Sequence, residues 1–141
     1  MNHNQEMQRQ RATIELLLQE NQDKELTNAM LIIAKLPKNA SFLDYLDVSE
    51  EEQNENKKVI KNAIRTLLNR YEFIALGIKY GAFEERIYKE LQYSNVMNVW
   101  INAKPLIMEL RRRKNKNTYF QEFEQLADKW GKEPLKSHKN T

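Results

Sequence analysis

The sequence contains no cysteine, and only three glycines and three prolines among its 141 residues. Without cysteine the chain has no thiol nucleophile, no thiolate metal ligand and no disulfide. The shortage of glycine and proline leaves few tight turns, which disfavours a β-sandwich or barrel and favours long helices. Three scattered glycines also build neither a phosphate-binding loop nor a dinucleotide-binding fingerprint. These absences favour an all-α protein without the common catalytic motifs.

Histidine and long apolar runs are also scarce. His3 and His138 lie near opposite ends of the chain, where side chains are least often ordered, so we expect no metal site and no cofactor. The longest apolar runs, 30–34 and 73–78, are far shorter than the ~20 residues that cross a bilayer. No signal peptide is recognisable at the N-terminus. We therefore expect a cytoplasmic protein without a membrane segment in this chain.

Hydrophobic residues make up 40% of the chain and charged residues 30%, which is typical of one folded domain with a single core. We predict a single helical domain over residues 1–141, with residues 1–8 and 133–141 loosely ordered because both ends are polar. The spacing of apolar residues predicts about six helices. Their expected ranges are 5–20, 24–36, 49–80, 84–92, 96–114 and 118–130.

Local signals define several of these boundaries. Asp23 is expected to cap the second helix, and Ser49 with Glu52 forms the pattern of a capping box that would open the longest one. That helix is apolar on nearly every side over residues 67–78, which predicts a central position in the fold. Pro105 predicts a kink or break in the helix 96–114. The aromatic residues of the last two segments recur at helical spacing and are expected in the core: Trp100, Tyr119, Phe120, Phe123 and Trp130.

Polar residues interrupt the apolar part of the central helix. Asn69 and Glu72 lie three residues apart, and Arg65 precedes Asn69 by four residues. A buried carboxylate needs a partner because an unpaired buried charge is costly. We expect Glu72 to bond across to the C-terminal helices through an arginine or lysine. The candidate cations are Arg65, Lys104, Arg111, Arg112 and Arg113. The simplest interpretation is a buried polar network that fixes helix register; a binding pocket anchored by Glu72 and a catalytic or metal-binding carboxylate are the alternatives.

A basic run begins in the last turn of the predicted helix 96–114 and continues just beyond it. The run and its neighbouring aromatic residue comprise Arg111, Arg112, Arg113, Lys114, Lys116 and Tyr119. Such a run complements the helix dipole, contacts a partner protein, or binds phosphates with Tyr119 as a stacking surface. Consecutive helical residues are about 100° apart, so three arginines cannot share one face. We predict that one arginine is internal and that the other two, with Lys114, are external, too few for tight nucleic-acid binding. The acids between Asp44 and Glu55, six without a base, either attract this run or face another partner.

Three segments carry a family resemblance: LNRYEFIALGIKYGAFEERI, WINAKPLIMELRRR and YFQEFEQLADKW. From about residue 11 onward the chain resembles the bacterial and prophage family catalogued as domain of unknown function four-seven-six-zero. Many of its members resemble membrane-anchored proteins with a preceding apolar segment; this sequence lacks that segment, so the resemblance implies no anchor here. It implies no assigned activity either. The matching positions are Asn69, Glu72, Gly77, Gly81, Glu85, Trp100, Pro105, Arg112 or a neighbour, Phe123, Glu124, Leu126 and Trp130. The family-like spacing implies that Arg112 is the internal arginine and that Arg111 and Arg113 are external.

Three classes of function are compatible with these features. We expect a non-catalytic helical interaction protein whose partner is another protein, such as a phage or prophage accessory protein that modulates or inhibits a host or phage complex. The alternative is a weak nucleic-acid-associated protein that uses the basic C-terminal third. The third is an enzyme that uses a buried carboxylate.

Overall fold

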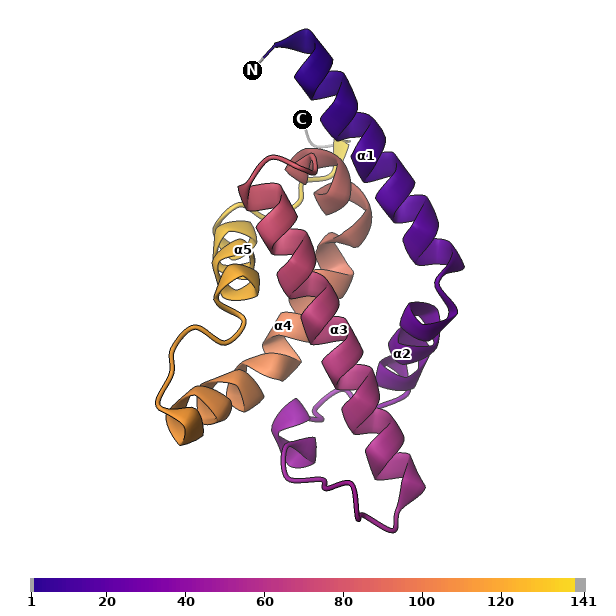
Figure 1. The fold of residues 1–141 in the computed structure, drawn as a ribbon, viewed down its shortest axis with the longest axis vertical. Helices are drawn as coiled ribbons and strands as arrows, with labels where there is room; N and C mark the ends of the chain where they lie inside the picture. Colours follow the sequence, from indigo (N-terminus) through magenta and orange to yellow (C-terminus); the bar gives the residue numbers. More distant parts are fainter. Residues whose placement is uncertain (1, 139–141) are drawn as a thin grey trace.

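The computed structural model describes residues 2–138, which form five α-helices, one short 3₁₀ helix and no β-strand. Figure 1 shows their arrangement, and the all-α prediction is confirmed. The elements are α1 (His3–Gln22), α2 (Lys24–Ala34), η1 (Phe42–Tyr45), α3 (Glu55–Lys79), α4 (Glu85–Lys114) and α5 (Gln121–Lys132).

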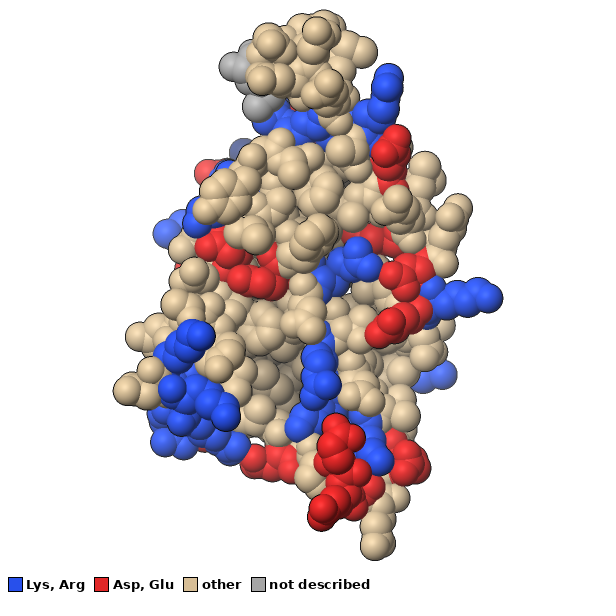
Figure 2. Space-filling view, viewed as in Figure 1, with Lys and Arg blue, Asp and Glu red and all other residues tan. Residues whose placement is uncertain are grey.

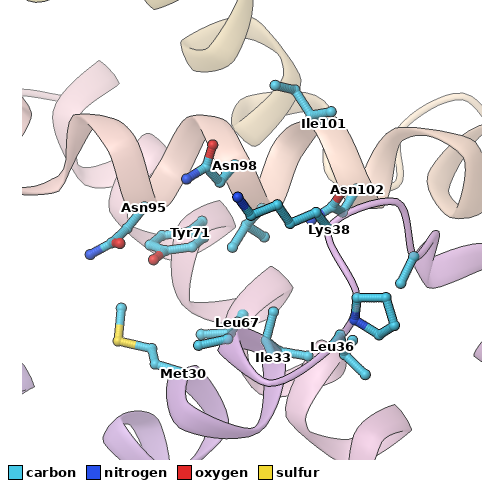
Figure 3. Close-up of a pocket in the computed structure, with 14 residues that line it drawn as sticks. Met30, Ile33, Leu36, Lys38, Leu67, Tyr71, Asn95, Asn98, Ile101 and Asn102 are labelled. Atoms are coloured by element: carbon cyan, nitrogen blue, oxygen red, sulfur yellow. The ribbon is translucent and has the colours of Figure 1, made fainter.

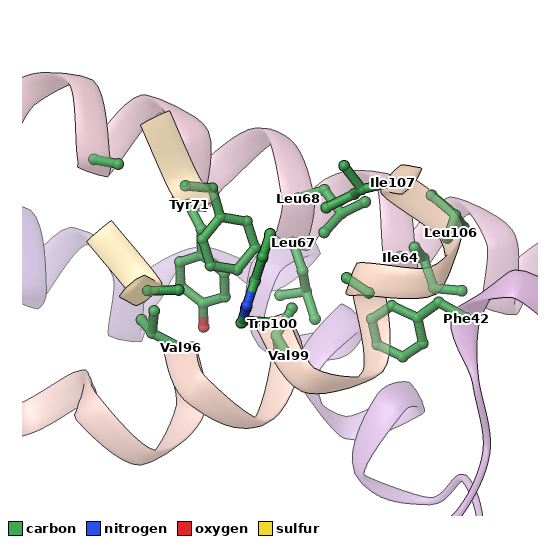
Figure 4. Close-up of a cluster of buried hydrophobic side chains, with 14 of the residues drawn as sticks. Phe42, Ile64, Leu67, Leu68, Tyr71, Val96, Val99, Trp100, Leu106 and Ile107 are labelled. Carbon is green, nitrogen blue, oxygen red and sulfur yellow. The ribbon is translucent and has the colours of Figure 1, made fainter. Parts of the chain in front are cut away.

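Helix α3 runs through the middle of the molecule, with α2, α5, α4 and η1 packed against it (Figure 1). Its residues Leu67 and Ile74 are almost fully buried, so the predicted central position is confirmed. Figure 4 shows Leu67 and Tyr71 of α3 packed with Trp100 of α4 in the core. The prediction of apolar packing on nearly every side is wrong on one face, where Phe73 and Leu76 are 56% and 42% exposed.

The long helix starts later than predicted. Asn54 is the N-cap of α3, and its side-chain oxygen accepts hydrogen bonds from the backbone N–H groups of Asn56 (3.0 Å) and Lys57 (3.3 Å). The predicted capping box at Ser49 is wrong, because residues 49–54 form turns and Glu52 accepts a hydrogen bond from the Asn54 N–H (3.2 Å). Ser49 and Asn54 both lie in this polar run and both suit an N-cap, so the sequence alone does not determine at which of them the helix begins.

The predicted break before residue 96 is absent, which is why five helices replace the expected six. Helix α4 is continuous from Glu85 to Lys114, since one buried face passes without interruption through Tyr88, Val96 and Val99. Pro105 lies inside this helix and donates no backbone hydrogen bond, so the carbonyl of Ile101 loses its helical partner. Ile101 is exposed, which lets water reach this carbonyl. Figure 1 shows that α4 changes direction along its length.

The first two helices follow the predicted pattern closely. Asp23 caps α2 by accepting a hydrogen bond from the Leu26 N–H (3.0 Å), as predicted. Helix α1 begins already at His3, where Asn2 and Gln5 form a capping box. Residues 3–8 are thus helical but exposed, and residues 133–138 are exposed as well. Loose order at the two ends stays a prediction, and its outermost part, Met1 and residues 139–141, lies outside the described residues.

Two glycines shape the connection between α3 and α4. Gly81 has a positive φ of 79°, a conformation that favours glycine, directly after the C-terminal end of α3. Gly77 allows close packing, because a Cβ atom placed there would lie 2.5 Å from the ring of Phe83. The turn and the first part of α4 therefore fold back tightly on α3.

Candidate functional site

Glu72 acts as the N-terminal cap of another helix. Its carboxylate projects from α3 and accepts hydrogen bonds from the backbone N–H groups of Phe123 (2.8 Å) and Glu122 (3.4 Å). Helix α5 needs this partner, because its own N-cap residue, Phe120, has a left-handed backbone and provides no side-chain hydrogen bond. A carboxylate at a helix N-terminus is also favoured by the helix dipole. The expected contact between Glu72 and the C-terminal helices exists, but through backbone amides.

The rest of the predicted buried network is wrong. Asn69, Arg65 and Arg112 are all exposed, and Glu72 is half-buried and forms no ion pair within residues 2–138. Asn69 lies beside Asp23 and Arg70 at the surface between α2 and α3. Helical spacing of three residues placed Asn69 and Glu72 on neighbouring faces, but only the face of Glu72 meets α5.

Removing the Glu72 carboxylate should destabilise the domain through α5. We expect Glu72→Ala to lower the free energy of unfolding by about 1–2 kcal/mol, the usual cost of a lost N-cap. Glu72→Gln should cost less, because the amide oxygen can still accept from the Phe123 N–H. Urea unfolding measures both, with Asn69→Ala as the exposed control on the same helix. Equal stability of Glu72→Ala and Asn69→Ala would contradict the capping role.

Arg111 is the internal arginine of the basic run. It is 8% exposed, and its guanidinium donates hydrogen bonds to the Tyr119 carbonyl (2.7 and 3.0 Å) and to the Glu124 carboxylate (2.8 Å). The prediction that one arginine points inward is correct, but the choice of Arg112 is wrong. Arg111 continues the buried stripe that Ala103 and Ile107 form at four-residue spacing.

The next two arginines form exposed ion pairs. Arg112 pairs with Glu109 of the same helix (2.7 Å), and Arg113 pairs with both Glu109 (2.9 Å) and Asp47 (2.5 Å). Hydrogen bonds from Arg112 and Arg113 hold the pKa of Glu109 at about 2, so this carboxylate stays ionised at neutral pH. The acidic segment and the basic run therefore meet within the fold, through Asp47.

The remaining cations of the run have no acidic partner within residues 2–138. Lys114 makes no ion pair, and the Lys116 ammonium lies 5.3 Å from the centre of the Tyr119 ring. Tyr119 is half-buried, so one part of its ring is covered by the protein and another lies beside Lys116. The basic run is thus divided into one internal arginine, two neutralised arginines and two available lysines.

A groove lies between α3, η1 and the C-terminal half of α4, with a volume of about 610 Å³. Figure 2 shows it as a tan hollow between groups of blue side chains. No acidic residue lines it, and Arg65 of α3 and Lys114 of α4 have no acidic partner within the described residues. We call it the cationic groove. Its lining residues are Tyr45, Leu46, Lys61, Ile64, Arg65, Leu68, Leu106, Leu110, Arg113, Lys114 and Phe120.

The cationic groove combines residues that are far apart in the sequence. Lys61 is fixed at one edge, where its ammonium donates a hydrogen bond to the carbonyl of Leu46 (3.1 Å) and another to that of Val48. Ile64 and Leu68 occupy the next turns of α3 on the floor. The four-residue repeat of cations and apolar residues from Lys61 to Leu68 could have indicated an amphipathic face, but the opposing wall from α4 is visible only in the fold.

A buried carboxylate lies elsewhere, between α1 and α4. Glu20 is 5% exposed and accepts hydrogen bonds from the hydroxyl of Tyr88 (2.9 and 3.2 Å). Burial raises the pKa of Glu20, and burial also raises the pKa of the Tyr88 and Tyr71 phenols, which stay protonated. Within residues 2–138 no group of three or more acidic or histidine side chains could hold a metal ion.

Glu20 should make stability depend on pH. Its folded-state pKa lies above the ordinary value of 4.5, so the folded protein binds this proton more tightly than the unfolded chain. The contribution of Glu20 to stability is therefore greatest below about pH 4.5 and falls as the pH rises through the folded-state pKa. We expect Glu20→Gln, which cannot ionise, to gain stability relative to the wild type as the pH rises above the ordinary glutamate pKa of 4.5. Urea unfolding at several pH values tests this, with the exposed Glu15→Gln as control; a stability difference independent of pH would contradict it.

The helical core forms a single all-α domain, and the cationic groove lies beside the end of α4. The chain belongs to the family described as Domain of unknown function (DUF4760), whose family model matches residues 1–130. The resemblance inferred from the sequence is thereby confirmed, and it extends to the N-terminal helix. No curated protein and no solved structure matches the chain. None of the helices within residues 2–138 is long and apolar enough to span a membrane.

Proposed function

We propose that this domain is a non-catalytic interaction protein that binds an acidic amphipathic helix of a partner protein in the cationic groove. The supporting observation is the combination of an apolar floor with cations on two facing walls and no lining carboxylate. The wider proposal is a cytoplasmic phage or prophage accessory protein that modulates a host or phage complex. Its basis is the family resemblance and the interaction surface.

The shape of the cationic groove suits a helix that anchors by its side chains. A volume of about 610 Å³ holds a few large apolar side chains and falls within the usual range for binding pockets. Amphipathic helices bind such grooves through apolar residues at positions i, i+3, i+4 and i+7. Acidic residues beside these anchors would meet Arg65 on one wall and Lys114 on the other. Complementary charge of this kind increases the association rate and selects the partner.

The alternative functions receive less support from the same contacts. Nucleic-acid binding needs several unpaired cations directed at phosphates. In the basic run Arg111 is internal and Arg112 and Arg113 are paired with acids, which leaves the two lysines. An enzyme that used Glu72 would have to release this carboxylate from the two backbone amides at the start of α5.

A designed peptide tests the proposal. Its length is about 16 residues, with leucines at i, i+3, i+4 and i+7 and glutamates on the flanks, and it carries a fluorescent label. A second peptide replaces every glutamate with lysine, and a third contains the same residues in scrambled order. We expect the acidic helix to bind with a Kd on the order of 10 µM at low salt by fluorescence anisotropy, and the others at least about tenfold more weakly.

Charge reversal locates the binding site. The variant Arg65→Glu/Lys114→Glu should weaken binding of the acidic helix by about tenfold or more. The matched control, Arg86→Glu/Lys104→Glu, changes two exposed cations of α4 outside the groove and should bind as the wild type. Absence of binding, or equal binding by both double variants, would contradict the proposal. Tighter binding of single-stranded DNA, with a steep dependence on salt, would favour the nucleic-acid alternative.

A further inference from the structure

A second cavity opens between α2 and α4, with residues of α3 at its floor (Figure 3). Its volume is about 480 Å³, and it shares no lining residue with the cationic groove. We infer that this cavity, named here the asparagine pocket, binds a small organic anion that carries a carboxylate on a compact apolar body. This inference does not depend on the proposed partner helix. The polar lining residues of the pocket are Lys38, Tyr71, Asn95, Asn98 and Asn102, and apolar lining residues are Met30, Ile33 and Leu67.

The polar wall of the asparagine pocket comes from α4. Asn95, Asn98 and Asn102 follow one another at intervals of three and four residues, so their carboxamides form a row about 10 Å long on one side of the helix. Asn98 and Asn102 make no side-chain hydrogen bond to the described residues, and Asn95 only donates to the Gln92 side chain (3.0 Å). Each amide can donate two hydrogen bonds to a bound ligand. These amides, of which Asn95 and Asn98 are exposed to solvent, thus form a row of donors along the edge of the cavity.

Lys38 supplies a positive charge from the opposite side. It belongs to the connection after α2, and Figure 3 shows its side chain extended across the cavity toward Asn98 and Tyr71. No carboxylate lines the asparagine pocket, and Lys38 has no acidic partner within the described residues. An anion that entered the cavity would therefore meet an uncompensated ammonium group and amide donors together.

The hydroxyl of Tyr71 provides an independent indication of a ligand. Tyr71 is 1% exposed, lines the asparagine pocket, and its hydroxyl has no hydrogen-bond partner among residues 2–138. Figure 3 shows this oxygen at the side of the cavity near Asn95 and Met30. Leaving a buried hydroxyl without a hydrogen-bond partner destabilises the fold, so buried hydroxyls are normally paired in the functional state. An acceptor atom of a bound ligand would pair with it after a small movement of the side chains that cover this oxygen.

Apolar side chains determine the other half of the ligand. Met30 and Ile33 of α2 and Leu67 of α3 line the cavity opposite the row of amides. A flexible methionine beside branched aliphatic residues accommodates a compact ring or branched chain. The pocket therefore fits an amphipathic acid better than a fully polar anion such as inorganic phosphate.

Three probes with the same phenylalkyl body and different head groups test the inference on the full chain. They are 4-phenylbutyrate, its neutral amide and the corresponding amine. We expect the carboxylate to bind with a Kd on the order of 1 mM, as suits so small a ligand, and to shift the backbone NMR signals of residues 95–102 and of Lys38. The amide should bind at least about fivefold more weakly, and the amine should not bind measurably.

Variants then distinguish a ligand site from a structural cavity. Tyr71→Phe removes only a hydroxyl without a partner, so we expect unchanged or greater stability but weaker binding of the carboxylate. Lys38→Ala should weaken binding by about fivefold or more, while the exposed Lys35→Ala should leave it unchanged.

Several outcomes would overturn the inference: no saturable binding of the carboxylate, equal binding of the amide, NMR shifts outside the pocket, or normal binding by both Lys38→Ala and Tyr71→Phe. Testing the acidic helix against Lys38→Ala distinguishes a failure of this inference from a failure of the proposed function. That variant should retain the peptide, whereas Arg65→Glu/Lys114→Glu should retain the carboxylate, so either proposal can fail while the other holds.

Discussion

Replacing Trp130 with alanine is expected to lower the free energy of unfolding by about 3–5 kcal/mol, the usual cost of removing a large aromatic side chain from a core. Trp130 is fully buried, and its indole N–H donates a hydrogen bond to the Glu85 carboxylate (2.9 Å). Its ring also lies 5.9 Å from that of Tyr93, centre to centre. The substitution therefore removes both the hydrogen bond and the ring packing that Trp130 of α5 makes with the first half of α4.

The phenylalanine variant separates packing from hydrogen bonding at this position. Trp130→Phe keeps much of the ring volume but loses the N–H, and Glu85 retains its ion pair with Lys129 (2.9 Å). We expect it to lose clearly less stability than Trp130→Ala in urea or thermal unfolding. A loss of less than about 1 kcal/mol for Trp130→Ala would be incompatible with a core position.

The second large effect is expected at Arg111. Arg111→Ala should lower the free energy of unfolding by about 3 kcal/mol, since it leaves the Glu124 carboxylate and the Tyr119 carbonyl without their main donor. Arg112→Ala should cost less than about 0.5 kcal/mol, because its ion pair with Glu109 is exposed. Urea unfolding compares the two adjacent arginines directly. Similar effects at both positions would contradict the division into an internal and an external arginine.

The sequence predicts the helices better than it predicts their interactions. The apolar period placed the central helix and the buried residues Phe123 and Trp130 correctly, because burial depends on one repeated spacing along the chain. The predicted break before residue 96 is wrong. Ser94 and Asn95 are residue types that favour the start of a helix, but the buried face of α4 continues past them. Tertiary packing outweighed local preference there.

The polar residues were harder to place, for a physical reason. Each cation near the end of α4 had several acids within possible reach, and sequence spacing does not determine which pair forms. The family pattern predicts Arg112 as the internal arginine. The buried residues of α4, however, recur every four residues at Ala103, Ile107 and Arg111, so Arg111 is the one that lies inside. The partners of Glu72 are backbone N–H groups. Every residue except proline has such a group, so no pattern of side chains in the sequence identifies the ones that Glu72 contacts. Both pockets combine walls from separate helices, so they are properties of the fold alone.

The cap that Glu72 provides has a consequence for the order of folding. Helix α5 has only 12 residues and no side-chain cap of its own, so it is too short to persist in water without its neighbours. Its cap comes from a residue 51 positions earlier in the chain, and closing so long a loop has an entropic cost that must be met first. We therefore expect the contacts between α3 and α5 to form after the transition state for folding. Mutations in α5 should accelerate unfolding much more than they slow folding.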